Sequence, residues 1–306
     1  MWDCRSETQR HSVAASTTEL PVRTLTPAAV GATRRDLRIA VTTRPGTPGA
    51  QPRQGLSDGA NYALHVGDDT AAVHARRRAL QLKLGVREIQ WLDQRHTTAL
   101  LLPGSMGSER PRETSPLGPV ADGCLVSESG QAAAVLTADC LPVALWADVV
   151  GGPVACVHAG WQGLYNGILE RAVRALRKHV ALAVPLQGWI GPAICGAHYE
   201  VARPLALRFI ERFGPVGVQA SPRDPDRCQL CLVSVATRVL ATAGVAGTRR
   251  SGWCTYSEVG SEVGSGVGKQ GEPGGFYSHR RLQHEVPRAA GTAKTTGRVA
   301  TLVWRS

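Results

Sequence analysis

The sequence predicts a single α+β domain, and its pattern supports that fold class in two ways. Short apolar runs of strand length are intermixed with segments of helical periodicity, without the strict strand–helix–strand order of a parallel α/β fold. Of the 306 residues, 43% are hydrophobic, enough to bury a substantial core. No internal repeat divides the chain. We therefore expect one mixed domain over residues 37–306, preceded by a disordered extension over 1–36, where Ser, Thr, Arg and Ala show no apolar periodicity.

Strand and helix signals follow one another along this domain. The expected strands are 37–43, 87–92, 132–137, 141–146, 154–157, 186–190 and 299–304. The expected helices are 70–84, 164–179, 201–213 and 233–243. Asp69 or Thr70 is a suitable N-cap for the first helix. In the second helix, apolar residues recur every four positions, at Leu164, Ile168, Ala172 and Leu176. A Gly-rich segment at 259–274 is expected to be a loop.

The charge of the chain limits its partners only loosely. The formal net charge is +11 and the pI is about 9.7, values that are compatible with anionic substrates or nucleic acid. The basic residues are mostly Arg and are scattered, which favours a composition without a binding role over a nucleic-acid surface, so we expect no nucleic-acid partner. No apolar run is long enough to span a membrane, and the first residues lack the apolar core of a secretory signal. A cytoplasmic enzyme without membrane contact is expected, whereas the sequence gives no indication of oligomeric state.

The eight cysteines are irregularly spaced along a long chain, which argues against a disulfide framework. Reduced thiols are the better expectation. The pair Cys228-x-x-Cys231 invites a metal or redox interpretation, but it lacks a second such pair to complete four ligands. Cys231 also fits the buried start of a strand or helix, and we favour that structural role.

His96, Cys140 and His158 are each expected to follow an apolar strand. Loops at strand ends present functional groups from a rigid sheet. Zinc binds imidazole nitrogen and thiolate sulfur, and a catalytic zinc typically has three protein ligands and one open position. A mixture of Cys and His suits zinc or copper better than magnesium or calcium. The spacing alone matches no short metal motif, so the residues by themselves leave a structural role open.

The sequences around these residues resemble one family. LTADCLPV, VHAGWQG, IGPAICGAHYEV, WCTYSE and FYSHRR are similar, in this order, to signatures of the laccase-domain or multicopper polyphenol oxidase family, also called purine nucleoside phosphorylase and peptidoglycan editing factor. Further similar elements are Thr43-Arg44, the stretch from Asn61 to Asp68, and Gln94-Arg95-His96. The resemblance covers residues 37 to 304 approximately. It implies a β-sandwich-like core of mixed sheets flanked by helices, with zinc held by His96, Cys140 and His158.

The resemblance leaves other polar residues with open roles. Asp139, next to the Cys ligand, is a candidate catalytic or ligand-orienting residue, whereas Asp122 is a candidate turn cap. Arg44 and His65 are candidate substrate-binding residues, with a salt bridge and a loop hydrogen bond as the alternatives. Arg280 and Arg281 could contact phosphate, with a folded ion pair as the alternative.

The resemblance implies a zinc-dependent purine nucleoside phosphorylase acting on adenosine, inosine, guanosine and methylthioadenosine, with adenosine deaminase activity. A hydrolase that edits peptidoglycan precursors is the alternative, and a basic binding module without turnover is also open. A copper polyphenol oxidase is less favoured, because a four-copper laccase needs about ten His ligands, whereas this chain has nine His and no H-x-H. Leu230-Cys231-Leu232 stands where the family usually has an acidic residue, which leaves substrate preference open.

Overall fold

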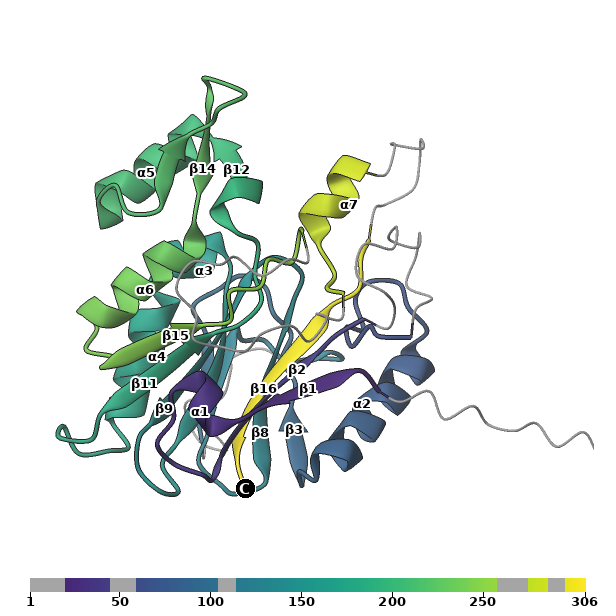
Figure 1. Cartoon of the computed structure of the whole chain (residues 1–306). Helices are drawn as coiled ribbons and strands as arrows, with labels where there is room; N and C mark the ends of the chain where they lie inside the picture. Colours follow the sequence, from purple (N-terminus) through teal and green to yellow (C-terminus); the bar gives the residue numbers. More distant parts are fainter. Residues whose placement is uncertain (1–19, 45–58, 104–113, 258–274, 286–294) are drawn as a thin grey trace, which may run out of the picture.

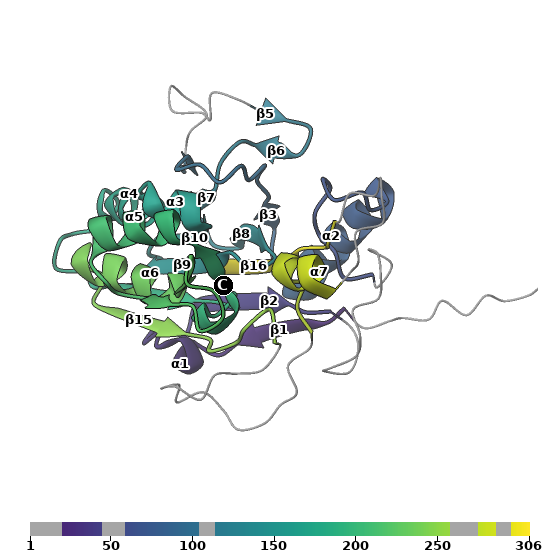
Figure 2. The same ribbon diagram turned by 90° about the horizontal axis from the view of Figure 1, so that it is seen from above.

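The computed structural model describes residues 20–44, 59–103, 114–257, 275–285 and 295–306, and two β-sheets packed face to face form its centre (Figures 1 and 2). The first sheet contains, in spatial order, β1 (Val22–Leu25), β2 (Leu37–Thr42), β16 (Val299–Arg305), β8 (Gln131–Thr137) and β3 (Glu88–Gln90). Its strands are antiparallel except for the parallel pair β3 and β8.

The second sheet is built mainly from the middle of the chain. In spatial order it contains β15 (Gly247–Arg250), β11 (Leu186–Ile190), β9 (Leu141–Ala147), β10 (Val154–Ala159), β7 (Gly123–Val126) and β4 (Leu100–Leu101). The β11–β15 and β4–β7 pairs are parallel and the others are antiparallel. Side chains from both sheets fill the space between them, including Ile39, Val135 and Val303 from the first sheet and Trp146 and Cys156 from the second.

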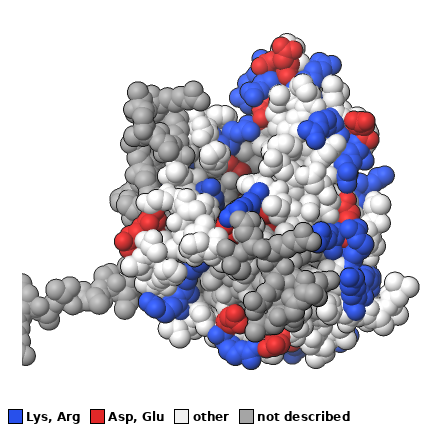
Figure 3. Space-filling model, turned by 180° about the vertical axis from the view of Figure 1, so that it is seen from behind, with Lys and Arg blue, Asp and Glu red and all other residues white. Residues whose placement is uncertain are grey.

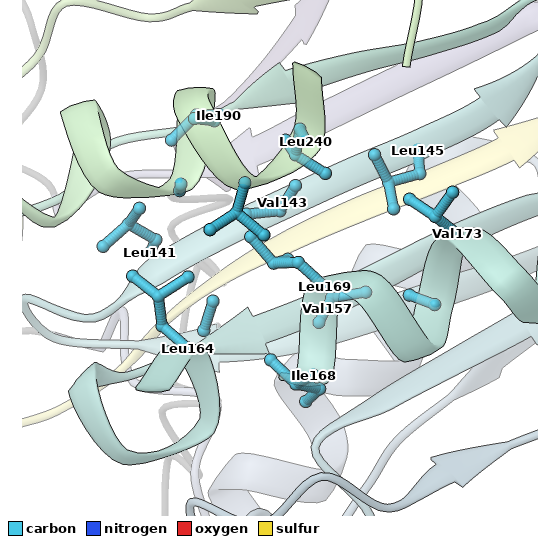
Figure 4. Packing of buried hydrophobic residues seen from close by; sticks show 14 of the residues in the cluster. Leu141, Val143, Leu145, Val157, Leu164, Ile168, Leu169, Val173, Ile190 and Leu240 are labelled. Carbon is cyan, nitrogen blue, oxygen red and sulfur yellow. The ribbon is translucent and has the colours of Figure 1, made fainter. Parts of the chain in front are cut away.

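Helices cover the outer faces of the two sheets (Figure 2). The outer face of the first sheet packs against α2 (Thr70–Leu84), whose Leu80 is fully buried. The outer face of the second sheet packs against α3 (Trp161–Tyr165), α4 (Ile168–Arg177) and α6 (Leu232–Thr242). Figure 4 shows this packing: Leu169 and Val173 of α4 and Leu240 of α6 meet the sheet residues Val143 and Leu145. The α+β fold class and the flanked sandwich core are therefore confirmed.

Smaller elements lie at one end of the sandwich (Figure 1). A three-stranded antiparallel sheet of β12 (Glu200–Ala202), β14 (Arg227–Leu230) and β13 (Val218–Ala220) packs with α5 (Arg203–Phe213). It is preceded by the 3-10 turn η1 (Gly196–His198), and α7 (His279–Glu285) lies at the same end. The remaining elements are α1 (Pro27–Val30) and the short hairpin strands β5 (Thr114–Ser115) and β6 (Gly118–Pro119).

Several expected boundaries agree with the structure and one helix does not. The helix at 70–84 is confirmed, and Asp69 is its N-cap, accepting a hydrogen bond from the Ala72 N–H at 2.7 Å. The expected helix at 164–179 is instead two helices, α3 and α4. Gly167 separates them with a left-handed backbone (φ 92°), which a helix interior does not allow. The periodic apolar positions in this segment are nevertheless fully buried.

The expected disordered extension is wrong for residues 20–36. β1 pairs antiparallel with β2 and forms the edge of the first sheet, and α1 follows with the Thr26 side chain as its N-cap and Pro27 at its first position. Val30 is buried at 2% exposure. Thr26 followed by Pro27 is a recognisable sequence signal for the start of a helix. For β1, the backbone gains the hydrogen bonds of a strand only by pairing with β2. Residues 1–19 and the expected Gly-rich loop at 259–274 lie outside the residues that the structure describes.

Candidate metal centre

The side chains of His96, Cys140 and His158 converge, and each comes from a different part of the chain. His96 lies in the loop after β3, Cys140 lies in the turn between β8 and β9, and His158 lies within β10. His158 is therefore inside a strand and not beyond it, one position before the strand ends. The close antiparallel pairing of β9 with β10 brings the turn of Cys140 next to His158, whose backbone partner is Pro142.

The three donor atoms lie close enough together to bind one ion. His96 Nε2 lies 3.7 Å from Cys140 Sγ, and all three donor atoms lie within 4.8 Å of one another. Zn–S and Zn–N bonds at a tetrahedral angle place sulfur and nitrogen about 3.6 Å apart. His158 is buried, Cys140 is half-buried and His96 is exposed, so the group opens to the surface on the His96 side. The residues present thus fit a three-ligand zinc ion with one accessible position.

Asp122 holds two of the three ligands. Its fully buried carboxylate accepts hydrogen bonds from the His158 ring at Nδ1 (2.8 Å), from the backbone N–H of His96 (3.0 Å) and from both the N–H and the hydroxyl of Thr97 (2.6 and 2.8 Å). His96 has a left-handed backbone (φ 58°), which is unfavourable for a residue other than glycine. The bonds to Asp122 stabilise this conformation and leave Nε2 of His158 as the ring nitrogen available for a metal.

Asp122 was expected at most to cap a turn, and its link to the ligands was missed. The role of Asp122 could have been predicted from its residue type and from its position in the sequence. A carboxylate directly before a buried strand, in a chain with two candidate His ligands, is the common partner of a metal-bound imidazole.

The ligands also shift one another's pKa. Burial by itself raises the pKa of Cys140, but the positive charge and hydrogen bonds of His158 and His96 outweigh it and lower that pKa to about 6. Burial by itself lowers the pKa of His158, but Cys140 and Asp122 outweigh it and raise that pKa to about 9. Cys140 is therefore a thiolate at neutral pH, which is the form that binds metals.

Asp139 does not lie among the three converging donors. One of its oxygens accepts the Thr255 hydroxyl at 2.7 Å and the other accepts the backbone N–H of Arg280, also at 2.7 Å. Its backbone is left-handed (φ 96°). Asp139 thus ties the turn that carries Cys140 to two distant segments, those of WCTYSE and FYSHRR.

The candidate substrate residues are placed unequally. Arg280 donates to the Glu200 carbonyl (2.8 Å) and lies over the Tyr199 ring, 5.0 Å from its centroid. Arg281 donates to the carbonyls of Tyr256 and Phe276. Both guanidinium groups therefore donate to backbone carbonyls in the described part of the chain.

Arg44 follows β2, and His65 lies in the segment before α2. Arg44 lies over the ring of Tyr277, 5.0 Å from its centroid. His65 is exposed, and its pKa is lowered first by desolvation and then by the positive charge of Arg298.

Arg298 is a further candidate that the sequence did not indicate. It precedes β16, and the negative charges of Cys140 and Asp139 act on it, opposing the lowering of its pKa by burial. Its charge also lowers the pKa of His279, after the effect of desolvation. Arg298 therefore brings a positive charge near the three donors and connects them electrostatically with His65. An isolated Arg in a Thr- and Gly-containing stretch carries no motif, so sequence alone could not select it.

The pair Cys228 and Cys231 takes structural positions. Cys228 lies in β14, and Cys231 is the N-cap residue of α6, where its sulfur accepts the Ser234 hydroxyl at 3.2 Å. Neither belongs to the two groups of converging metal-type donors in the described part of the chain. The predicted helix start at Cys231 agrees with this placement.

The chain matches a known family over most of its length. The family described as multi-copper polyphenol oxidoreductase laccase matches residues 38–306, and the chain belongs to it. A purine nucleoside phosphorylase of Xylella fastidiosa is 30% identical over 280 residues, covering 87% of this chain and 96% of its own. One of Pseudomonas aeruginosa is 33% identical over 273 residues, covering 88% and 93%.

Solved structures show the same fold. The Neisseria meningitidis protein NMB0706 is 26% identical with a TM-score of 0.65, covering 89% of this chain and 95% of its own. YlmD from Geobacillus stearothermophilus is 26% identical with a TM-score of 0.65, covering 88% and 92%. Among the described residues, none of the helices has the length and apolarity that a membrane crossing requires.

Proposed function

We propose that this chain is a zinc-dependent purine nucleoside phosphorylase that acts on adenosine, inosine, guanosine and methylthioadenosine, with adenosine deaminase as a second activity. The observation that carries the proposal is the His96–Cys140–His158 donor group, open on one side and held by Asp122. The relatives from Xylella fastidiosa and Pseudomonas aeruginosa, which match most of the chain, bear the name purine nucleoside phosphorylase.

The donor set favours zinc over copper. Two imidazoles and one thiolate match the ligands of catalytic zinc, whose bound form supplies a Lewis acid that polarises oxygen and makes water more nucleophilic. A blue-copper site generally adds a weak axial Met, and the chain has only two Met, at positions 1 and 106. The polyphenol oxidase function suggested by the family description is therefore the less favoured one.

The positive groups around the donors suit an anionic co-substrate. Arg298 and Cys140 interact electrostatically, and the backbone N–H of Arg280 donates to Asp139. A guanidinium binds phosphate through paired hydrogen bonds, so we assign phosphate binding to these two residues first. His65, whose lowered pKa keeps it neutral at pH 7, is assigned to a ribose hydroxyl. Arg44 and Arg281 are assigned a secondary part in substrate binding, because Arg298 and Arg280 are the two arginines linked to Cys140 and Asp139.

The test is a product analysis with purified protein, adenosine and phosphate. Phosphorolysis releases adenine and ribose 1-phosphate, whereas deamination releases inosine and ammonia. We expect the products of both reactions from the wild type. His158→Ala should abolish both reactions, whereas Cys228→Ser, which leaves the donor group intact, should retain them. Formation of neither product by zinc-loaded wild-type protein would rule out the proposed function and favour a peptidoglycan-precursor hydrolase or a binding module.

A further inference from the structure

A second group of metal-type side chains lies outside the site described above, formed by Cys195, His198 and Cys254. Cys195 and His198 are separated by two residues on the single 3-10 turn η1, of which Cys195 is the N-cap residue. Cys254 follows β15, and an isolated parallel bridge between Ala193 and Cys254 brings the two segments together. Residues 59 positions apart in the chain thus meet in one place.

The donor atoms of this group converge as closely as those of the first. His198 Nδ1 lies 3.0 Å from Cys195 Sγ and 3.5 Å from Cys254 Sγ, and all three donor atoms lie within 4.8 Å of one another. These separations are close to the roughly 3.6 Å between sulfur and nitrogen at a tetrahedral zinc ion. Cys254 is buried, while Cys195 and His198 are partly accessible, so an ion could reach the group from one side.

Backbone N–H groups surround both sulfurs. The N–H of Cys195 donates to Cys254 Sγ at 3.4 Å, and a backbone hydrogen bond from Ser257 also reaches Cys254. Cys254 and burial raise the pKa of Cys195, and the backbone N–H groups of His198 and Ala197 oppose this effect in part. Such bonds stabilise negative sulfur, as second-shell donors do for thiolate ligands. The hydrogen bond from Cys195 also lowers the pKa of Cys254 well below that of a free thiol.

His198 is oriented by an aromatic neighbour. The ring of Tyr256 stacks on the imidazole with centroids 4.5 Å apart and an interplanar angle of 16°. The Tyr256 hydroxyl in turn lies 3.2 Å from Nδ1 of His284. This stacking fixes the plane in which Nδ1 faces the two sulfurs, whereas a Cys195–Cys254 disulfide would make no use of the imidazole.

We propose that Cys195, His198 and Cys254 form a second metal site, which binds Zn²⁺ through two thiolates and one imidazole. Binding replaces the protons of the thiols with the ion and releases them to solvent. The site is coupled to the first through Asp139: Ile194, next to Cys195, donates its N–H to the Asp139 carbonyl at 3.0 Å, and Thr255, next to Cys254, donates its hydroxyl to the Asp139 carboxylate at 2.7 Å. A second ion would therefore hold in place the turn that carries Cys140.

The test is a titration of the full chain with Co²⁺, after chelation under reducing, oxygen-free conditions. Cobalt reports thiolate ligands through charge-transfer absorption, and the second site has two thiolates against one in the first. We expect two equivalents bound in the wild type. Cys195→Ser should remove one equivalent and about two thirds of the charge-transfer intensity, because the second site has two of the three thiolates. His158→Ala should also remove one equivalent, but the intensity that comes from the second site should remain. Cys228→Ser is the matched control and should retain both equivalents.

The half-buried His198 offers a second variant in case a Cys195 replacement disturbs folding. His198→Ala should lose tight binding of one equivalent and keep the far-ultraviolet circular dichroism of the wild type. A wild-type stoichiometry of one equivalent, with charge-transfer intensity unchanged in Cys195→Ser and His198→Ala, would overturn the proposal. So would a Cys195–Cys254 disulfide that mass spectrometry finds in protein purified with zinc present, because such a bond consumes both thiolates. The proposed function is judged separately, by the products that the zinc-loaded protein forms from adenosine and phosphate.

Discussion

The carboxylate of Asp122 lies 2.8 Å from Nδ1 of His158, and both groups are buried. This contact fixes the ring so that its other nitrogen faces Cys140 and His96. Since the same carboxylate accepts the N–H groups of His96 and Thr97, it sets two of the three donor positions at once.

We therefore expect Asp122→Asn to weaken zinc binding by roughly 10- to 100-fold, because an amide cannot accept all of these hydrogen bonds. Competition with a chromophoric chelator measures the change. The control is Asp148→Asn, because the Asp148 carboxylate accepts the hydroxyl of Thr33, which is not one of the donor residues. This variant should bind zinc as the wild type does. Equal affinities in the two variants would show that Asp122 does not position the ligands.

Gly160 should tolerate no side chain. A Cβ built there would lie 2.7 Å from His96 Cδ2 and 3.0 Å from Cys140 Sγ, although the backbone itself (φ −65°) suits alanine. Gly160→Ala should therefore displace two ligands and reduce zinc affinity by about 10-fold or more, with a smaller effect on folding. Measuring zinc affinity and thermal unfolding of the metal-free protein separates the two effects; loss of stability without loss of affinity would contradict this expectation.

Cys140 should remain reactive at unusually low pH in metal-free protein. Its pKa is lowered to about 6, so the reactive thiolate persists as the pH falls and is lost only below that value, whereas an ordinary thiol is already protonated below about 8.5. The rate of alkylation of Cys140 by iodoacetamide, followed by peptide mass spectrometry, measures this dependence. Zinc should protect the thiol, and His158→Ala should shift the profile towards higher pH. A profile centred near that of a free thiol would be the contrary result.

Arg298 should matter for phosphate more than for metal. Its charge lies near the donor group, and replacing it with Ala removes a guanidinium that can bind an oxyanion. We expect Arg298→Ala to raise the KM for phosphate by about 10-fold or more in the adenosine assay, and Arg298→Lys to recover part of the loss. Unchanged zinc content in both variants is the required control, and an unchanged KM would remove Arg298 from the site.

The segment before residue 37 should contribute to stability. Val30 is 2% exposed and packs in the core between the sheets, so Val30→Ala should lower the free energy of unfolding by roughly 1–3 kcal/mol. Val150→Ala, at a position 71% exposed, should change it by less than about 0.5 kcal/mol. Chemical denaturation of both variants gives the comparison, and equal midpoints would show that α1 is not anchored.

The sequence predicted most of the core strands, because a buried strand is a continuous apolar run that needs no partner to be recognised. Val154–Val157 and Leu141–Trp146 are examples, and both lie in the second sheet. It did not predict β1 or β14, whose residues are only partly apolar and become strands by pairing with β2, β12 and β13. The break at Gly167 was missed because the apolar spacing continues across this residue, whereas the helical backbone conformation is interrupted there.

The sequence predicted the candidate site residues that stand within recognisable motifs. His96, Cys140 and His158 are such residues, and the structure brings their donor atoms together. Asp122, Arg298 and the Cys195–His198–Cys254 group were not predicted, because their roles arise from contacts between segments far apart in the chain. Cys195 and His198 have the spacing of a ligand pair, but their third partner, Cys254, can be found only in three dimensions.

The position of β16 has a consequence for synthesis of the protein. This strand follows every other described strand in the chain, yet it lies in the middle of the first sheet, hydrogen-bonded to β2 on one side and β8 on the other. Until residues 299–305 leave the ribosome, β2 and β8 have a gap between them, and the turn after β8 that carries Cys140 lacks a completed sheet behind it. The nascent chain therefore exposes Cys140, a proposed metal ligand, before the scaffold can hold it, and correct loading with metal is expected only after translation of β16.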